Sequence, residues 1–496
     1  MSSATRTSLW ERVDARRVEM RRASEAPSAP APPRRFRWVV DAMLPLALSI
    51  VAGIAVLLPA SLPYEARVAL FIFALAAILW STTKINAAYV ALAALTVAVI
   101  TGGSPQESLF DALASDVVWL MIGAFVLGGA MRATGLAARL TGFVVARASS
   151  VRGILWLLTT VLIPLSFVIP STSGRAAVVM PVFRSIADAA GDKKIVRALA
   201  LLMPTVILVA TITTIIGAGS HLIANDLLAQ IAGRRISFAQ WALWGTPFGV
   251  VASYASAWVI MRLFLDKDRL DRRLEIPREA RSAFSRAERI TLVVLTLMVG
   301  LWLTEAFHGL EIATVAVAGA LFLTLPGLGV MSWKDGLKSV SWNLIVFVGA
   351  ALALGEALIE SGAAQWIIDN LFAVSGIAGA RSGTLILLIV AFVSLTSHIY
   401  MTSHAARAAA LVPPLLYLAG SLDLNPVAVL FIGTVGMDYC LTFPVSSKAL
   451  LMFQEAGSET YGPADLLRLS SVLLIIHLVL IVVFYYGYWQ WTGLAL

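Results

Sequence analysis

The sequence predicts an all-α polytopic membrane protein built from two related halves. Of its 496 residues, 59% are hydrophobic and only 13% are charged, whereas charged residues make up about 25% of a typical soluble domain. Apolar runs long enough to cross a bilayer recur along the chain, and a spanning helix needs about 20 such residues. A sequence pattern also occurs once in each half. Together these observations exclude a soluble globular fold.

Two basic segments set the expected orientation. Residues 1–37 hold nine arginines against four acids, and residues 262–289 hold nine basic residues against six acids. Both flank apolar spans, so the positive-inside rule places them in the cytoplasm, beside anionic lipid headgroups. We therefore predict a multi-pass protein of the inner (plasma) membrane with a cytoplasmic N-terminus. The net charge of +8 is explained by these segments, so no nucleic-acid partner is predicted. The expected divisions are a basic tail at 1–37, a first half at 38–264, a cytoplasmic loop at 265–289 and a second half at 290–496.

The first half is predicted to begin with regular spans and then to become irregular. Continuous spans are expected near 38–59, 66–83, 86–102 and 117–133, and a long helix near 240–264. Between them lie a hairpin at about 153–188, broken at Pro170-Ser171-Thr172-Ser173-Gly174, and a broken helix at about 198–232, interrupted at Gly217-Ala218-Gly219-Ser220-His221. Backbone that leaves the helix at membrane depth must be satisfied by protein or water, so each break predicts a buried or water-lined place.

The second half is predicted to repeat this plan. Spans are expected near 290–306, 312–326, 342–360 and 468–490, the last with an aromatic end typical of the headgroup region. A hairpin at about 383–420 breaks at Thr402-Ser403-His404, and a broken helix at about 426–457 breaks near Pro444-Val445-Ser446-Ser447-Lys448.

The two hairpins share a motif. Ser171, Arg175-Ala-Ala and Pro181 recur at identical spacing as Ser403, Arg407-Ala-Ala and Pro413. An internal repeat with broken spans in corresponding places is the best sequence indication of a carrier's binding site. An odd number of full crossings separates the hairpins if each enters and leaves by the same face, so the repeats are predicted to be inverted.

The residues at the breaks favour an anion. A helix that begins after a polar turn directs free N–H groups and a partial positive charge at that turn. An arginine at bilayer depth costs about 2.5–3.5 kcal/mol or more, and its forked donors match carboxylate or sulfonate oxygens. Lys448 would add a third cation, and Asp438 is a candidate coupling acid. The predicted substrate-binding residues are Ser171, Thr172, Ser173, Arg175, Gly217, Ser220, His221, Ser403, His404, Arg407, Ser446, Ser447 and Lys448.

Each of these residues also has a structural interpretation. Arg175 and Arg407 either bind substrate or cap hairpin carbonyls and pair with fixed acids. The serines and histidines of the breaks either contact substrate or satisfy the turn backbone. Asp438 either couples transport to protons or neutralises Lys448 or an arginine. Cys440 is interpreted as a packing residue, and because it is the chain's single cysteine, no cysteine metal cluster is predicted.

With these motifs in place, the sequence resembles the divalent anion/sodium symporter family, which comprises dicarboxylate, citrate and sulfate carriers. The resemblance covers about residues 40–490. Family hairpins carry a Ser-Asn-Thr turn followed by Ala-Thr-Ala-Ala and a proline. Their broken helices carry Gly-Thr-Pro-Pro-Asn. The corresponding segments here are Ser171-Thr172-Ser173-Gly174-Arg175-Ala176-Ala177, Ser403-His404-Ala405-Ala406-Arg407-Ala408-Ala409, Gly217-Ala218-Gly219-Ser220-His221 and Ser446-Ser447-Lys448.

The resemblance implies eleven spanning helices, two re-entrant hairpins and an elevator mechanism in which a transport domain moves against a scaffold. It also implies a homodimer, a small anionic substrate and sodium sites at the hairpin tips. This chain departs from the family where both asparagines are replaced, by Thr172 and His404, and where Arg175 and Arg407 replace small hydroxyl residues. We therefore hypothesise that the arginines replace bound sodium, so that the carrier is an exchanger, a uniporter or proton-coupled.

Other interpretations remain open at this stage. One is a sodium-coupled dicarboxylate or sulfate symporter of the same fold, and another is a carrier of the same fold for a different ion. A third is a membrane sensor with a carrier fold that does not transport. An enzyme is not predicted, because the sequence offers no metal-ligand set, no nucleophile with a base and no glycine-rich phosphate loop. No cofactor is predicted, and sodium is left undecided.

Overall fold

A computed structural model describes residues 34–57, 62–136, 139, 147–275, 283–363, 366, 383–457 and 459–496. The chain divides into two compact units, Met1–Val51 and Ala52–Leu496. Helix α2 (Arg34–Leu57) begins in the first unit and contains Pro45. Most of the predicted basic tail at 1–37, and the middle of the predicted loop at 265–289, lie outside the described residues.

The described residues are almost entirely helical, apart from one antiparallel bridge between Ser150 and Arg273. In the described part of the chain, seven helices are long and apolar enough to cross a membrane. They are Tyr64–Thr82, Ser108–Thr134, Lys193–Thr213, Phe238–Phe264, Trp342–Glu360, Gly383–Tyr400 and Pro463–Trp491. Five shorter apolar helices accompany them: Met43–Val56, Ala87–Ile100, Val151–Phe167, Ile312–Leu323 and Pro426–Asp438. The predicted class of all-helical polytopic membrane protein is confirmed, whereas the count of eleven crossings and the inverted relation of the repeats stay predictions.

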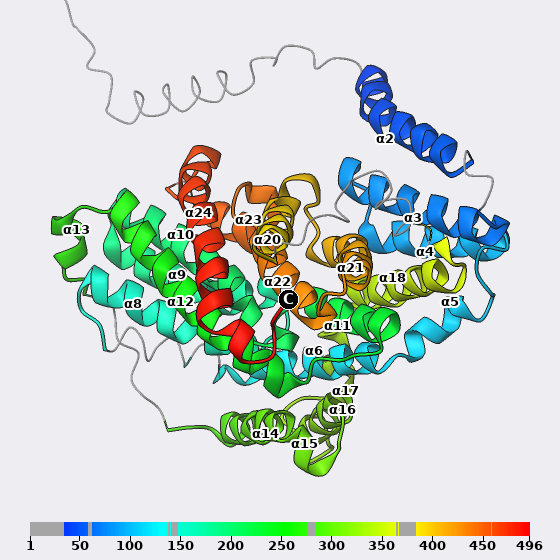
Figure 1. Cartoon of the computed structure of the whole chain (residues 1–496). Coiled ribbons are helices and arrows are strands. Elements are labelled where there is room, and N and C mark those ends of the chain that lie inside the picture. Colours follow the sequence, from blue (N-terminus) through cyan, green and yellow to red (C-terminus); the bar gives the residue numbers. More distant parts are fainter. Residues whose placement is uncertain are drawn as a thin grey trace, which may run out of the picture. The chain divides into compact units, whose positions relative to one another are not determined.

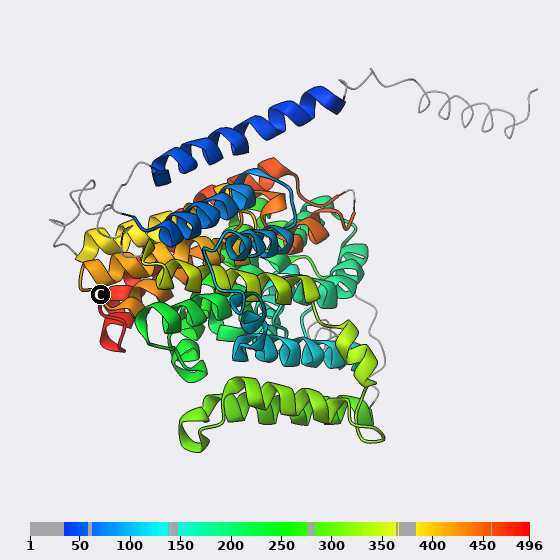
Figure 2. The same ribbon diagram turned by 90° about the vertical axis from the view of Figure 1, so that its right-hand side faces the viewer.

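Helix α6 (Asp116–Thr134) contacts α14 (Arg286–Leu303), α16 (Ile312–Leu323) and α18 (Trp342–Glu360). Ser115 caps α6 by accepting a hydrogen bond from the Val117 N–H, and Gly135, with φ of 75°, ends it. α3 (Tyr64–Thr82) packs on α4 (Ala87–Ile100), and both contact α18. α14 packs on α16, which packs on α6, as Figures 1 and 2 show. The short elements between these helices are α5 (Ser108–Asp111), η1 (Ala112–Ala114), α13 (Lys267–Asp271), α15 (Glu305–His308) and α17 (Trp333–Lys338).

The interrupted segments of the first half fold into paired helices and short 3-10 turns. The chain runs through α8 (Val151–Leu162), η2 (Pro164–Phe167), α9 (Thr172–Ala190), α10 (Lys193–Val209), η3 (Ala210–Thr213), η4 (Ile215–Gly217) and α11 (Gly219–Ala232), and then enters α12 (Phe238–Phe264). The helix therefore stops before the motif at Ser171 and again between Val209 and Gly219.

The second half shows the same order of elements. The chain runs through α20 (Gly383–Tyr400), α21 (His404–Ser421), α22 (Pro426–Asp438), η6 (Pro444–Ser446) and α23 (Lys448–Gln454), and ends in α24 (Pro463–Gly487) and η7 (Trp489–Trp491). Its two interruptions lie before the motif at Ser403 and between Asp438 and Lys448.

The second helix of each hairpin packs between the halves in the same way. In the first half α9 contacts α10 and also α23, and in the second half α21 contacts α22 and also α11. Each hairpin thus touches its own broken helix and the far part of the other one. This exchange brings the two broken helices together, and α10 contacts α23 while α22 contacts α11.

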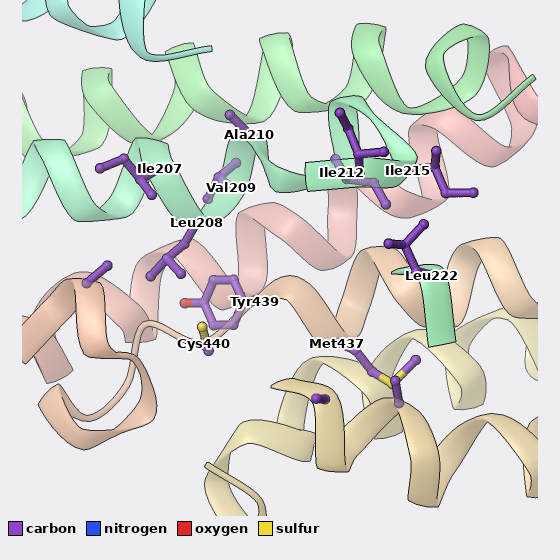
Figure 3. Close-up of a cluster of buried hydrophobic side chains, with 14 of the residues drawn as sticks. Ile207, Leu208, Val209, Ala210, Ile212, Ile215, Leu222, Met437, Tyr439 and Cys440 are labelled. Carbon is purple, nitrogen blue, oxygen red and sulfur yellow. The ribbon is translucent and has the colours of Figure 1, made fainter. Parts of the chain in front are cut away.

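The interruption of the first broken helix, between Val209 and Gly219, is called the first break, and that of the second, between Asp438 and Lys448, the second break. Apolar side chains fill the space between these two breaks. Figure 3 shows Leu208, Ile212 and Leu222 from the first broken helix facing Met437 and Cys440 from the second. All five are at least 95% buried. A polar group that lies among these side chains is therefore surrounded by hydrocarbon, where an unpaired polar atom is costly.

Candidate functional site

A serine caps the second helix of each hairpin. The Ser171 Oγ accepts a hydrogen bond from the Gly174 N–H (3.2 Å), and the Ser403 Oγ accepts one from the Ala406 N–H (3.3 Å). This geometry explains the repeated serine, because the first N–H groups of a helix need such a partner. The Ser171 Oγ also lies 3.0 Å from the Ser173 Oγ. Thr172, Ser173 and His404 are half-buried at these helix starts.

Arg175 and Arg407 each follow their capping serine by four residues and are completely buried. The Arg175 Nη2 donates to the Gly217 carbonyl oxygen at 2.8 Å and to the Thr211 Oγ1 at 3.4 Å. Its Nε and Nη1 have no hydrogen-bond partner among the described residues. Arg175 therefore closes the first break onto its own hairpin and still presents two unused donors.

Arg407 differs from Arg175 in its partners. None of its three guanidinium nitrogens donates to an oxygen or nitrogen atom within the described parts of the chain, and the Cys440 thiol, a weak acceptor, lies in contact with it. The Cys440 thiol, His398 and His404 lie within electrostatic range of its charge. These groups are neutral or weak partners, and a buried cation without a counter-charge carries a large desolvation cost.

The two arginines occupy equivalent places. Counted back from the last residue of the 3-10 turn, Thr211 stands six residues before Gly217 and Cys440 stands six residues before Ser446. Thr211 contacts Arg175, and Cys440 lies beside Arg407. The Ser446 hydroxyl is buried without a partner in the described structure. The first half thus satisfies its arginine in part, while the second half leaves the corresponding donors free.

A histidine and an aspartate connect the halves next to Arg175. The His221 Nε2 lies 2.8 Å from the Asp438 Oδ2, and both side chains are at least 95% buried. The His221 Nδ1 lies 3.0 Å from the Thr214 carbonyl oxygen, and its ring packs on Trp241 at 4.9 Å between centroids. Asp438 is also within electrostatic range of Arg175. Of the two kinds of partner considered from the sequence, Lys448 or an arginine, Asp438 meets an arginine, and it also meets a histidine that the sequence did not pair with it.

Two further histidines line the second break. The His404 Nε2 lies 2.9 Å from the Cys440 Sγ. The His398 Nε2 lies 2.6 Å from the Thr442 Oγ1, which in turn lies 2.7 Å from the Ser470 Oγ. His404 therefore reaches across from its hairpin to the second broken helix.

The remaining predicted residues have different positions. The Ser447 Oγ caps α23 by accepting a hydrogen bond from the Ala449 N–H at 3.2 Å. The Ser220 hydroxyl is buried and has no partner among the described residues. Lys448 is exposed. Its charge therefore lies in a different environment from the two buried guanidinium groups.

Three neighbours of the charged groups were not among the predicted site residues: Thr211, Cys440 and Trp241. Cys440 was interpreted as packing only. Sequence spacing could have indicated Thr211 and Cys440, because each stands the same number of residues before the second part of its broken helix. Trp241 offers no comparable signal, because its contact with His221 depends on the packing of α12.

The donor set does not resemble a metal site. Within the described residues, no group of three His, Cys, Asp or Glu side chains is placed to hold a metal ion. A hard cation such as sodium requires oxygen ligands. The Gly217 carbonyl oxygen at the first break already accepts from Arg175. The guanidinium thus places a fixed positive charge at this oxygen, and a cation close to it would be repelled.

Comparison with known proteins agrees with the fold. The sequence model described as "Sodium:sulfate symporter transmembrane region" matches residues 40–495. A protein of Cupriavidus necator named only "Membrane protein" is 27% identical over 492 residues and covers 94% of both chains. The citrate/succinate antiporter of Escherichia coli K12 is 22% identical, covering 73% of this chain and 76% of its own. The sodium-dependent dicarboxylate transporter SdcS of Staphylococcus saprophyticus is 23% identical, covering 74% of this chain and 76% of its own.

A solved structure gives the same fold. The YdaH transporter of Alcanivorax borkumensis superimposes with a TM-score of 0.50 at 15% identity, covering 86% of this chain and 99% of its own. The fold and these matches define a polytopic membrane anion transporter rather than an enzyme. The chain belongs to the sodium:sulfate symporter family, also called the divalent anion/sodium symporter family, as its motifs predict.

Proposed function

We propose that the chain is a secondary transporter that moves a small divalent anion, with carboxylate, sulfonate or sulfate groups, across the inner membrane. The observation that carries the proposal is Arg407, a completely buried arginine whose guanidinium meets the Cys440 thiol but no oxygen or nitrogen acceptor in the described structure. An anion supplies both the missing counter-charge and the missing acceptors. Arg175 adds two further unused donors.

The relatives support the class of substrate. One relative is named for citrate and succinate and another for dicarboxylates. These anions and sulfate share oxygen pairs that match a guanidinium fork. The capped starts of α9 and α21 add backbone N–H groups and the positive ends of two helices.

We propose further that transport does not require sodium. Arg175 stands at the first hairpin tip as a fixed cation, and it occupies the Gly217 carbonyl oxygen. The exchange of contacts between the halves, in which α9 meets α23 and α21 meets α11, supports an inverted repeat with two re-entrant hairpins. Eleven crossings, a homodimer and an elevator movement complete the proposal, and they rest on the family resemblance.

The decisive experiment compares the two arginines by substitution with methionine, which keeps much of the volume and removes the charge. Purified protein is titrated with sulfate, succinate and citrate by calorimetry, and thermal unfolding is measured without anion. Arg407→Met should weaken anion binding about 10- to 100-fold, the equivalent of about 1.5–3 kcal/mol for charge-assisted hydrogen bonds. It should not lower the unfolding midpoint of the free protein, because it removes an uncompensated buried charge.

Arg175→Met should weaken binding and also lower the midpoint of the free protein, because it removes the donor to Gly217 and Thr211 and the positive charge near Asp438. Arg184→Ala, at an exposed position on the same helix as Arg175, is the matched control and should change neither quantity. Wild-type binding by Arg407→Met would contradict the proposed site. Uptake into proteoliposomes with and without a sodium gradient tests the coupling, and strict sodium dependence in the presence of ionophore controls would favour the sodium-coupled alternative.

A further inference from the structure

The contact between His221 and Asp438 has a requirement of its own. The Thr214 carbonyl oxygen can only accept a hydrogen bond, so the His221 Nδ1, 3.0 Å away, must carry a hydrogen. The Nε2 of the same ring lies 2.8 Å from a carboxylate oxygen of Asp438. Two lone pairs repel at this distance, so one hydrogen must lie between these atoms. The observed pair therefore holds a proton, either on His221 Nε2 or on Asp438 Oδ2.

This proton changes the charge of the site by one unit. With the proton in place the pair is neutral in both arrangements, because imidazolium with carboxylate and imidazole with carboxylic acid each sum to zero. Arg175 and Arg407 then leave two positive charges. Without the proton the pair carries one negative charge, which faces Arg175, and only one positive charge remains. The protonated site thus matches a dianion, and the deprotonated site does not.

Charged, titratable and aromatic groups from several elements surround the pair of His221 and Asp438. Arg175 approaches Asp438 from α9, Cys440 approaches it from the second break, and His404 on α21 is within range of His221 together with Arg407. On α12 the neighbour is the Trp241 ring. Helices α6 and α18 also pack on α11, but their acids Asp116 and Glu356 act on Asp226, five residues after His221 in the middle of α11.

We infer that His221 and Asp438 form a proton-binding site that loads one proton together with one dianion. The inference rests on the proposed function, because it requires that Arg175 and Arg407 bind the anion. The proton adds to the pair from water on one side of the membrane and returns to water on the other. In a low-dielectric site, binding of a dianion favours the protonated pair, and by linkage the protonated pair favours the dianion to the same extent.

Calorimetry in buffers of different ionisation enthalpy measures this proton directly. Sulfate is the first probe, because its charge is constant from mildly acid to mildly alkaline pH, and succinate at alkaline pH is the second. Wild-type protein should take up close to one proton per anion at alkaline pH and none at acid pH. Its affinity should fall about tenfold per pH unit over the range in which uptake occurs.

Asp438→Asn removes the carboxylate that shares the proton, while an amide can still contact the histidine, so proton uptake and the pH dependence of affinity should both disappear. His221→Gln tests the same prediction from the other side. Asp226→Asn changes a buried acid on the same helix as His221, with its own partners Arg235 and Gln230, and should keep both wild-type properties.

The outcomes separate the two proposals. Binding of sulfate or succinate by wild-type protein without proton uptake at any pH overturns the proton site and leaves the anion site intact. Full proton uptake by both Asp438→Asn and His221→Gln also overturns it. Failure of wild-type protein to bind either anion overturns the proposed function and this inference with it. The wild-type proton number decides the question even if neither variant folds.

Discussion

The first break has no room for a side chain at Gly217. A Cβ built there would lie 2.1 Å from the Thr211 carbonyl oxygen, which is backbone and cannot turn aside. Gly217→Ala should therefore shift η4, separate the Gly217 oxygen from Arg175 and lower stability by about 1–3 kcal/mol, the usual cost of overpacking. Thermal unfolding in detergent and anion titration measure the two effects.

Gly219 is the matched control, two residues further along the same break. A Cβ there would meet only the ends of the Leu344 and Met121 side chains, at 3.2 and 3.4 Å, and such ends can move. Gly219→Ala should keep a midpoint close to that of wild type. Equal losses of stability in both variants would mean that the break rejects any added side chain, and that the Thr211 contact has no special role.

Also at the scale of residues, the sequence predicted the two arginines at bilayer depth but not the difference between their partners. The motif repeats at identical spacing, so the pattern alone indicates two equivalent residues. Whether an arginine finds a partner depends on the broken helix packed beside it, and there Thr211 and Gly217 are replaced by Cys440 and Ser446. That difference lies in tertiary contacts, which no local pattern contains. The same is true of His221 and Asp438, which lie 217 positions apart in the chain.

Among the elements, α6 and α16 depend on a close approach of their backbones. A Cβ at Gly123 on α6 would lie 2.7 Å from the carbonyl carbon of Ala316 on α16. Gly123→Ala should force the two helices apart and lower the unfolding midpoint, at a cost of about 1–3 kcal/mol. Gly300→Ala on α14 is the control, because nothing lies near its added Cβ.

Gly300 lies inside a helix, where alanine is favoured over glycine by about 0.5–1 kcal/mol. Gly300→Ala should therefore leave the midpoint unchanged or raise it. Differential scanning fluorimetry of both variants beside wild type gives the comparison. If Gly123→Ala proves as stable as Gly300→Ala, the close packing of α6 on α16 is not as the structure has it.

Most long helices lie where the apolar runs predict them, and the short ones were not predicted. α18 begins and ends at the predicted residues 342–360, and α20 begins at residue 383, where the second hairpin is predicted to begin, and ends before its predicted break. The apolar periods and the caps of long helices are local signals. Elements such as α17 and η4 are too short to show a period. α17 depends on a single cap, the Ser332 Oγ, which accepts from the Asp335 N–H.

For the whole molecule, a cluster of charged side chains joins the first hairpin to the chain segment that leads into the second half. Asp192, in the turn between α9 and α10, accepts from the Arg269 Nε of α13 at 2.9 Å. Near it Arg152 of α8 pairs with Asp271 at 2.8 Å. The bridge between Ser150 and Arg273 adds backbone hydrogen bonds to the same junction. These contacts join the first hairpin to the loop that precedes the second half. The hairpin and the loop can move as one body only while these contacts persist.

The charge of Asp192 gives this junction a dependence on pH. Burial alone would raise the pKa of Asp192, but the Lys194 N–H and the Arg269 guanidinium outweigh it and lower this pKa below its usual value. A carboxylate with a lowered pKa in the folded state stabilises the fold above its unfolded pKa of about 4. This stabilisation is lost as the pH falls through the folded pKa.

Asp192→Asn should therefore lower the unfolding midpoint at neutral pH, and the difference from wild type should shrink as the pH falls below about 4. Asp268→Asn, at an exposed position on α13, should match wild type throughout. Thermal unfolding over a series of pH values makes the comparison, and a deficit of Asp192→Asn that stays constant down to the acid end would show that its charge does not hold the junction.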